Sequence, residues 1–543
     1  MSKELSMGKS SATGSIYLLV GVALSSIIMA VGTIILARIL PVASDYGLYG
    51  AALIPSSIIN FFRDWGVNSA MTKQIASLRA AGKESEIHDV IVTGVLFEVI
   101  SGASLALLCF VLSGFFASAL NAPAASTFIS IMSLSIFGGA ILTAASSIFV
   151  GFERMKLNSF TIICQAIVKT AVGPLLVVIG YGVLGATVGY VASYLAGGLI
   201  GISIVYFVLF RSLQKLKDGR RSVVNVLKPM LAFGAPLMVS NIVIGVLPLL
   251  FNSLMVIYAG PSMYGNYLVA LNFAVLLTFV TIPINTVLFP AFSKIDVQKD
   301  SDLMQTVFSS SVKYTAIFLV PLTFAVMVLS APMVNALFGY LPSGGPKYAF
   351  APLFLTLYPI SNLFVVVGSL SVGNFIAGVG KTKILMYQGF LTLSIGLPLA
   401  FVMIPLFGVV GGILAGILAT VPSLIFGLYW VWKNYRVKAD FKASINMIFA
   451  SLIAAAAAYL SLNVIGFGDW IHLIVGLIIF LVVYLASAPL TGAIQQVDIS
   501  NLRSMFSGLG IISKILEIAL RFMEKILRIR NNKSTKNQVE FIK

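Results

Sequence analysis

The sequence predicts an all-α integral membrane protein with 14 transmembrane helices, arranged as two parallel-repeat six-helix lobes plus two extra C-terminal spans. Three observations favour this class. The chain is 59% hydrophobic and only 10% charged, its basic residues fall on one predicted side of the membrane, and its halves share motifs at a nearly constant separation. Soluble proteins carry about 25% charged residues, so lipid surrounds most of this chain.

Fourteen apolar stretches, bounded by charged residues or by Gly, Pro and Asn, are predicted to cross the bilayer, whose core takes roughly 20 helical residues. The second stretch is short, and we expect its helix to continue past Arg63 and Asp64. The stretches cover approximately residues 16–37, 48–62, 89–115, 126–149, 157–179, 183–210, 231–258, 264–290, 312–337, 350–377, 385–403, 406–432, 443–464 and 470–490.

The distribution of Lys and Arg predicts the orientation. With the N-terminus inside, the inner segments hold 32 of the 35 basic residues, the outer loops hold Arg38 and Lys347, and Lys169 lies within a span. Because basic residues collect in cytoplasmic loops, we predict a multi-pass protein of the cell (plasma) membrane with cytoplasmic N- and C-termini. The net charge of +17 is then explained by membrane topology, and we expect no nucleic acid partner.

Three motifs occur in the same order in both halves of the chain. They pair residues 182–186 with 408–412, 151–156 with 378–383, and 46–47 with 264–265, at offsets of 218 to 227 residues. Each half then holds six spans, and an even number makes the halves parallel. Parallel repeats are a transporter architecture in which the substrate path lies between the halves.

These boundaries divide the chain into five parts. They are an N-terminal lobe (1–210, spans 1–6), a cytoplasmic linker (211–230), a C-terminal lobe (231–432, spans 7–12), spans 13 and 14 (433–495) and a basic amphipathic cytoplasmic tail (496–543). The tail predicts a helix from Val497 to about Ile529 with Met523 and Leu527 on its apolar side. An interfacial helix on the anionic inner leaflet fits this pattern; a packing helix or a partly disordered tail is the alternative.

The sequence offers no arrangement for catalysis, a cofactor or a metal. Its two histidines, His88 and His472, lie at opposite predicted membrane faces. The stretch 378–382 (Gly-Val-Gly-Lys-Thr) resembles a phosphate loop, but such a loop needs glycine where Phe375 stands. We therefore predict a protein that is not an enzyme and that has no catalytic residues, cofactor or metal site.

Two charged residues lie well inside predicted spans, Glu98 in the third and Lys169 in the fifth. A charge at the centre of a helical span costs about 2.5 to 3.5 kcal/mol on insertion scales, so each needs a partner or a role. One interpretation is a structural ion pair between Glu98 and Lys169. The other is functional: Lys169 supplies positive charge to an anion path, and Glu98 titrates or binds a cation.

Other charges lie at span ends. Arg38 is interpreted either as a headgroup anchor or as the rim of a cavity. Arg63 and Asp64 form either a local pair or a substrate gate, and Asp64 is the second candidate for ion coupling.

Uncharged polar residues occur along spans 7 and 8. In a hydrated cavity they hydrogen-bond sugar hydroxyls, and in a packed interface they bridge helices at around 0.6 kcal/mol each. They are Asn241, Asn252, Asn272, Thr281, Asn285 and Thr286. We select Asn252, Asn272 and Asn285, together with Arg38, Arg63 and Lys169, as candidate substrate-binding residues.

Several short motifs occur in order along the chain. They are Ala37-Arg-Ile-Leu-Pro41 followed by Tyr46-Gly47, Asp64-Trp-Gly-Val-Asn-Ser-Ala70, Tyr264-Gly-Asn-Tyr267, Leu288-Phe-Pro-Ala-Phe-Ser293 and Leu337-Phe-Gly-Tyr340. Together they resemble the motifs of polysaccharide-biosynthesis flippases of the multidrug/oligosaccharidyl-lipid/polysaccharide exporter superfamily. The resemblance covers about residues 14 to 432. It departs from the family at Pro41, which follows Leu40 without the expected glycine.

The resemblance implies that the chain flips a lipid-linked (diphosphate) oligosaccharide across the membrane by alternating access, for polysaccharide or glycoconjugate biosynthesis. It implies membrane lipids as partners, and glycosyltransferases or a polymerase of the same pathway as further ones. Two alternatives stay open: an ion-coupled multidrug antiporter of the same superfamily, and a non-transporting membrane scaffold of a glycan-assembly complex.

Overall fold

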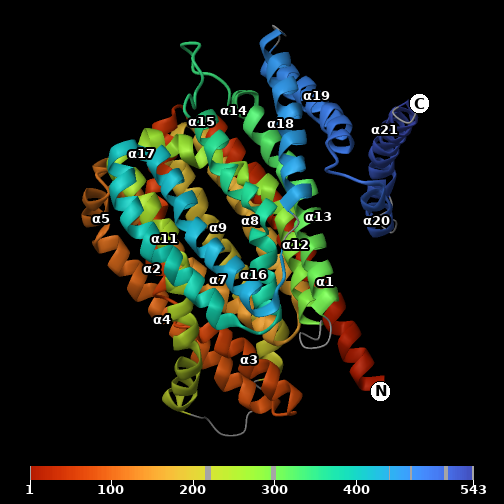
Figure 1. Cartoon of the computed structure of the whole chain (residues 1–543). Helices are drawn as coiled ribbons and strands as arrows, with labels where there is room; N and C mark the ends of the chain where they lie inside the picture. The colour runs from red at the N-terminus through yellow and green to blue at the C-terminus, as the bar shows by residue number, and fades with distance from the viewer. Residues whose placement is uncertain are drawn as a thin grey trace. The chain divides into compact units, whose positions relative to one another are not determined.

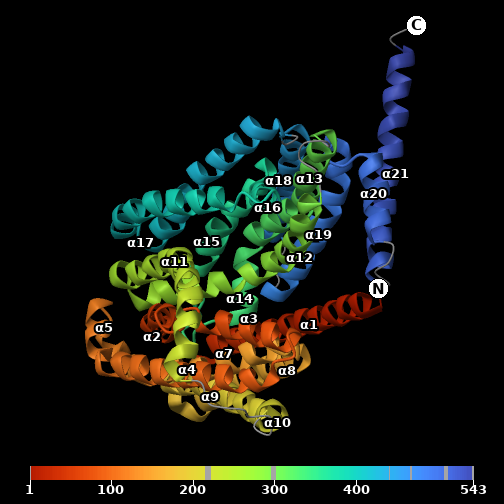
Figure 2. The same ribbon diagram turned by 90° about the horizontal axis from the view of Figure 1, so that it is seen from below.

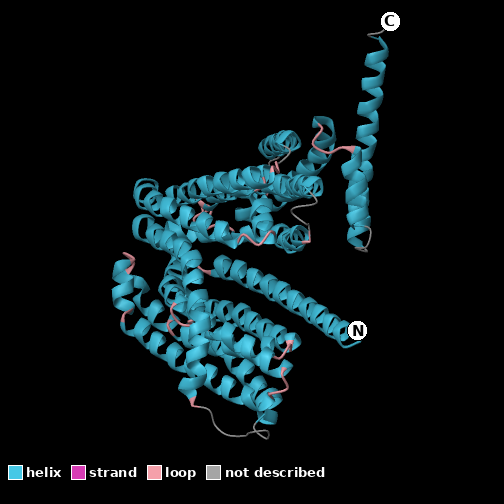
Figure 3. Cartoon of the chain, turned by 60° about the horizontal axis from the view of Figure 1, so that its bottom comes forward, coloured by secondary structure: helices cyan, strands magenta, loops and turns pink. Residues whose placement is uncertain are grey.

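The computed structural model of the chain describes residues 2–213, 222–294, 301–438, 441–464, 468–506 and 511–540 (Figure 1). Every regular element in these ranges is helical, and none is a strand (Figure 3). The all-helical class predicted from the sequence is therefore confirmed. Residues 214–221 of the predicted linker lie outside the described residues, as do the last three residues of the predicted tail.

The first half of the chain contains helices α1 to α11. They are α1 (Ser2–Ile39), α2 (Ala43–Phe61), α3 (Val67–Ala80), α4 (Glu84–Val111), α5 (Ser113–Ala119), the 3₁₀ turn η1 (Pro123–Ala125), α6 (Ser126–Met132), α7 (Leu134–Gly151), α8 (Met155–Leu176), the π-helical η2 (Val177–Tyr181), α9 (Gly182–Ile204), the π-helical η3 (Val205–Phe210), α10 (Arg211–Leu213) and α11 (Val223–Asn272).

The second half contains helices α12 to α21. They are α12 (Ala274–Ser293), α13 (Ser301–Val328), α14 (Ser330–Phe338), α15 (Ala351–Leu357), the 3₁₀ helix η5 (Tyr358–Val367), α16 (Ser369–Gly378), α17 (Thr382–Tyr435), α18 (Phe441–Val464), α19 (Asp469–Thr491), α20 (Gln496–Phe506) and α21 (Ile511–Glu540).

Within the described residues, nine helical segments are long and apolar enough to cross a membrane, or ten if the bent pair Ala351–Val367 and Ser369–Gly378 is one span. One of the nine, Thr382–Tyr435, has 54 residues. At 1.5 Å per residue it would be about 80 Å long if straight, more than twice a bilayer core of about 30 Å. The chain is thus a multi-pass membrane protein, and the count of fourteen crossings stays a prediction.

Glycines break the longest helices at corresponding positions of the proposed repeat. Gly182 (φ 50°, ψ −132°) and Gly408 (φ 57°, ψ −133°) have nearly the same backbone conformation, which favours glycine because φ is positive. Three residues later, a Cβ at Gly185 or Gly411 would overlap the preceding helix, at 2.8 Å from Leu176 and 1.9 Å from Met403. The shared motif thus builds the same tight turn twice.

The described chain divides into two compact units, here called unit 1 and unit 2. Unit 1 comprises Met1–Asn272, Leu341–Lys347 and Ala400–Gly412, and unit 2 comprises Phe273–Tyr340, Tyr348–Leu399 and Ile413–Lys543. The boundary at Asn272 lies inside the segment that the sequence assigns to the second lobe. The two-lobe division at residues 211–230 stays a prediction.

Unit 1 has a core in which α3, α4 and α7 pack together. Met71, Ile87 and Phe149 are fully buried there. Next to this core α8 and α9 approach closely, since a Cβ at Gly189 would lie 2.2 Å from the Cα of Gly173. Small residues permit such helix contacts in lipid, where the hydrophobic effect does not drive helix association.

Unit 2 contains a core formed by α13, α18 and α19, which lie side by side in Figure 2. The predicted tail helix is two helices, α20 and α21. Leu520, Met523 and Leu527 of α21 are buried in this same core. Because buried side chains cannot contact a membrane surface, the apolar side of α21 serves protein packing here, as in the alternative left open by the sequence.

Candidate functional site

A sharp turn in unit 1 positions the first charged candidates. α2 ends at Phe61, the backbone reverses at Trp65 (φ 50°) and Gly66 (φ 71°), and α3 begins at Val67. A Cβ at Gly66 would also lie 2.3 Å from the carbonyl oxygen of Gly234. The expectation that the second span continues as one helix past Arg63 is therefore wrong, because the chain leaves the helix before reaching it.

This turn directs Arg63 into the interior of unit 1. The side chain is only 6% exposed and forms an ion pair with Glu98 on α4, which is fully buried. The guanidinium also donates hydrogen bonds to the Asn60 side chain (3.2 Å) and to the Thr143 hydroxyl on α7 (3.1 Å). Its charge is thereby neutralised and its hydrogen-bonding groups are engaged, as burial of an ion requires.

Asn68, the second residue of α3, forms hydrogen bonds with both carboxylates of this cluster. Its amide nitrogen donates to Glu98 and to Asp64, each at 2.9 Å, and its backbone N–H donates to Asp64 at 3.0 Å. Its amide oxygen is buried and has no hydrogen-bond partner among the residues that the structure describes. A buried carbonyl oxygen without a partner can bind a water molecule or a small cation.

The structure corrects two pairings considered from the sequence. Glu98 pairs with Arg63 and not with Lys169. Arg63 and Asp64 do not form the local pair either, because Asp64 accepts its hydrogen bonds from Asn68. The reason is that α4 packs against α3 and α7, which places Glu98 beside the turn after α2. We name these five residues, Arg63, Asp64, Asn68, Glu98 and Thr143, the carboxylate cluster.

Lys169 on α8 lies among tyrosines instead. Its ammonium is 5.2 Å from the centre of the Tyr190 ring on α9. Tyr190 donates to the Tyr194 hydroxyl at 3.3 Å and packs edge-on against Tyr49 of α2 at 6.4 Å. Within the described part of the chain no carboxylate forms an ion pair with Lys169. These four residues are called the lysine–tyrosine site.

The predicted asparagines have separate surroundings. Asn272 donates to the Tyr46 hydroxyl at 3.2 Å in unit 1, so it bridges two helices. Asn285 accepts a 2.7 Å hydrogen bond from Asn374 in unit 2. Asn252 is half-buried on α11. The side chains of Asn241 and Thr286 lie outside the described part of the structure.

Arg38 lies in the last turn of α1, and its side chain is exposed. Its carbonyl oxygen accepts a 2.8 Å hydrogen bond from the Lys347 ammonium. Burial lowers the pKa of Lys347 to about 8, although the Asp45 carboxylate acts in the opposite direction. The loop at Leu341–Lys347 is thus tied to the end of α1.

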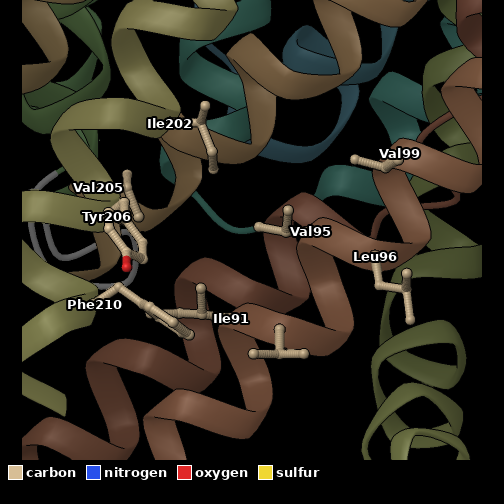
Figure 4. A pocket seen from close by; sticks show the side chains of 9 residues that line it. Ile91, Val95, Leu96, Val99, Ile202, Val205, Tyr206 and Phe210 are labelled. Carbon is tan, nitrogen blue, oxygen red and sulfur yellow. The ribbon is translucent and has the colours of Figure 1, made fainter. Parts of the chain in front are cut away.

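A separate cavity of about 350 Å³ lies between α4 and the end of α9 with η3 (Figure 4). Its wall is hydrocarbon apart from Tyr206, whose hydroxyl is seen in Figure 4. It offers no charge for a polar substrate. Within the described residues, no group of three or more His, Cys, Asp or Glu side chains is placed to hold a metal ion.

Several residues of these sites were not selected from the sequence. Asn68 follows Asp64 by four residues at a helix start, a spacing that suits side-chain contact. Tyr190 and Tyr194 have the same spacing. Thr143 carries no comparable signal, because only the packing of α7 brings it to Arg63.

Comparison with known proteins gives the family. The family described as "Polysaccharide biosynthesis protein" matches residues 11–296, slightly more than half of the chain. An uncharacterized membrane protein of Methanocaldococcus jannaschii, MJ1375, is 22% identical over 402 residues, which cover 71% of this chain and 89% of the relative.

Solved structures show the same fold at low sequence identity. The lipid II flippase MurJ in an inward closed conformation matches with a TM-score of 0.70 and 16% identity, over 88% of this chain and 98% of that one. An inward-facing multidrug resistance MATE transporter of the MOP superfamily matches with a TM-score of 0.59 and 16% identity, over 77% and 98%. The fold is that of MOP-superfamily transporters, and the chain belongs to the polysaccharide biosynthesis protein family.

Proposed function

We propose that the chain flips a lipid-linked oligosaccharide, joined to its carrier through a diphosphate, across the cytoplasmic membrane by alternating access. The observation that carries the proposal is Lys169, a cation deep in a predicted span that has no carboxylate partner among the described residues. Retaining a charge inside a membrane is expensive. A transport substrate that supplies the missing negative charge gives a reason for retaining it.

The chemistry of the lysine–tyrosine site supports this substrate class. An ammonium attracts the phosphate oxygens as a point charge. The half-buried rings of Tyr190 and Tyr194 offer apolar faces to sugar C–H groups, and their hydroxyls hydrogen-bond sugar oxygens, while the buried Tyr49 packs against Tyr190. Arg38, Asn252, Asn272 and Asn285 are proposed as further substrate contacts, whereas Arg63 is excluded because Glu98 and Thr143 already engage it.

Membership of a polysaccharide biosynthesis family and the fold shared with a lipid II flippase also support a lipid-linked oligosaccharide as the substrate. The fold is also shared with a MATE multidrug transporter, so an ion-coupled multidrug antiporter is the alternative function. We also propose that the chain works with glycosyltransferases that make the glycan or with a polymerase that consumes it.

We propose the carboxylate cluster as the coupling site, with Glu98 as first and Asp64 as second candidate. A proton or sodium ion that binds beside the unpaired Asn68 oxygen competes with Arg63 for the carboxylates. Such competition changes the packing of α3, α4 and α7 together, because each contributes a residue. One charge that moves through 100 mV yields about 2.3 kcal/mol.

We also propose cytoplasmic termini, as the Lys and Arg distribution predicts. Single cysteines at Ser262 and Pro342, in a background without Cys109 and Cys164, should react with an impermeant reagent outside sealed cells. A cysteine at Ser212 should not. All three positions are exposed, so labelling reports sidedness, and outside labelling at Ser212 would overturn the topology.

The function is tested in proteoliposomes with a fluorescent prenyl-diphosphate oligosaccharide. Flipping is read as the fraction that an impermeant reductant quenches, and a cationic dye is assayed in parallel. The proposal expects protein-dependent flipping that falls in Lys169→Gln. Dye transport without flipping would favour the antiporter, and neither activity would favour the scaffold.

A further inference from the structure

A cavity lined in part by basic residues lies in unit 2, and none of its lining residues belongs to the carboxylate cluster or to the lysine–tyrosine site. It has a volume of about 680 Å³. One side is formed by the start of α17 with the turn before it, including Lys381, Lys383 and Tyr387, and the other by the end of α17, including Trp430, Asn434 and Tyr435. Both ends of α17 meet here because its chain reverses at Gly408. We name it the α17 cavity.

The aromatic wall of this cavity is held in place by the core of unit 2. Trp430 and Tyr435 pack edge-on with ring centres 5.5 Å apart. Tyr435 in turn packs edge-on against Phe375 at 5.2 Å, and Phe375 is fully buried. The wall is therefore part of a packed aromatic cluster, so its form does not depend on a ligand.

The charge lining the cavity is positive and uncompensated. Lys381 and Lys383 are exposed and have no carboxylate partner within the part of the chain that the structure describes. Next to the cavity, at the end of α17, Arg436 and Lys438 flank the Trp432 ring at 5.5 and 6.0 Å. The cations thus attract an anion from outside the chain.

Exposed aromatic residues indicate that the cavity lies at the level of lipid headgroups. Tyr387, Tyr429 and Trp432 are 50%, 52% and 38% exposed at this end of α17. Tyr and Trp are enriched at membrane–water interfaces because their rings are apolar and their edges polar. Lys and Arg beside such rings, on the side predicted to be cytoplasmic, contact the anionic inner leaflet.

We propose that the α17 cavity binds the phosphate headgroup of an anionic phospholipid from the inner leaflet. The two lysines contact the phosphate, Asn434 and the Tyr387 hydroxyl hydrogen-bond the polar part of the headgroup, and the acyl chains stay in the bilayer beside α17. A nucleotide is not expected, because Phe375 replaces the glycine that a phosphate loop needs at that position. This site is independent of the proposed transport activity.

The test is native mass spectrometry of the full chain in detergent with added phosphatidylglycerol or phosphatidylcholine. Basic residues near an anionic surface contribute about 1 kcal/mol each, so the two lysines together account for roughly a tenfold or larger preference. We expect phosphatidylglycerol to bind at least about tenfold more tightly than phosphatidylcholine. The double variant Lys381→Gln/Lys383→Gln should lose this preference, and Lys381→Arg/Lys383→Arg should retain it.

Lys433→Gln is the matched control, since Lys433 is exposed at the same end of α17 but does not line the cavity. It should keep the preference. Inorganic phosphate at millimolar concentration should not displace the lipid; displacement would mean a site for free phosphate. Equal binding of both lipids, or a preference unchanged in the double Gln variant, would overturn the proposal.

Discussion

Unit 1 contains two basic residues, Arg63 and Lys169, whose surroundings differ in the opposite sense from what the sequence suggests, since the residue at the span end is the one paired with a buried carboxylate. Arg63 is 6% exposed, paired with Glu98 and hydrogen-bonded to Thr143. Lys169 lies 5.2 Å from a tyrosine ring and has no carboxylate partner in the described residues. The charge of Arg63 is neutralised by a carboxylate of the same chain, whereas no carboxylate of the described residues neutralises the charge of Lys169.

The difference separates a charge that holds helices together from a charge that is free to bind. Removing one member of a buried pair leaves the other uncompensated, so the carboxylate cluster should respond to mutation through stability. When a cation without a carboxylate partner is removed, no buried charge is left uncompensated, so the protein loses little stability. The lysine–tyrosine site should therefore respond through transport.

The largest effect is expected for Glu98→Ala, which leaves the Arg63 guanidinium buried without its carboxylate. We expect a loss of about 3 to 5 kcal/mol of stability, seen as a fall in the melting temperature of the purified protein or as loss of folded protein in size-exclusion chromatography. The double variant Arg63→Met/Glu98→Leu should recover most of it.

Glu153→Ala serves as the control for that prediction. Glu153 pairs with Arg79 at 3.9 Å, but its side chain is 61% exposed, and exposed pairs contribute little. If Glu98→Ala melts at the wild-type temperature, the Arg63–Glu98 ion pair does not stabilise unit 1, and Arg63 then differs from Lys169 in its contacts but not in its effect on stability.

Lys169→Gln should reduce flipping by tenfold or more and change the melting temperature little. Hydrogen bonds to charged groups contribute about 1.5 to 3 kcal/mol, which corresponds to roughly 10- to 100-fold. The assay is the proteoliposome flipping rate, with Lys156→Gln, an exposed lysine on the same helix, as the control. Full flipping in Lys169→Gln together with a clear loss of stability would make Lys169 structural.

Glu98→Gln keeps the size of the side chain and removes its charge, so it separates coupling from folding. We expect the stimulation of flipping by an imposed pH or sodium gradient to disappear, with a smaller loss of stability than in Glu98→Ala. The measurement compares wild type and variant under pH, sodium and voltage gradients. Should the variant keep its full response to each of them, Glu98 is not the coupling residue, and Asp64→Asn is tested next.

The smallest effect concerns Lys347, a third cation of unit 1, which is 8% exposed and bonded to a backbone carbonyl. Burial lowers its pKa from 10.5 to about 8. Between these values the unfolded chain binds a proton that the folded chain lacks, so the stability contributed by Lys347 rises with pH from about 8 to 10.5. The melting temperature of wild type minus that of Lys347→Met should therefore increase between pH 7.5 and 9.5.

The exposed Lys433 gives the reference for this pH series. Wild type minus Lys433→Met should stay constant over the same range. A difference for Lys347→Met that is equally flat would show that Lys347 does not titrate in this window.

The sequence predicted the helical membrane fold because the length and composition of apolar runs depend on local chemistry alone. It also paired the motifs that begin at Gly182 and Gly408, and the structure shows that both glycines adopt a positive φ that other residues rarely adopt. The break after α2 was missed, although Gly66 was visible, because an apolar run shows where a helix can continue and not where packing ends it.

For the candidate site, the apolar runs around Glu98 and Lys169 predicted that both lie inside spans, but not which neighbour each side chain faces. A helix repeats every 3.6 residues, so a buried side chain points to whichever helix packs on that face. The packing of α4 against α3 and α7 decided that Glu98 meets Arg63 and Asn68. Lys169 lies among tyrosines for the same reason, because α8 packs against α9. Only the tertiary structure determines such neighbours.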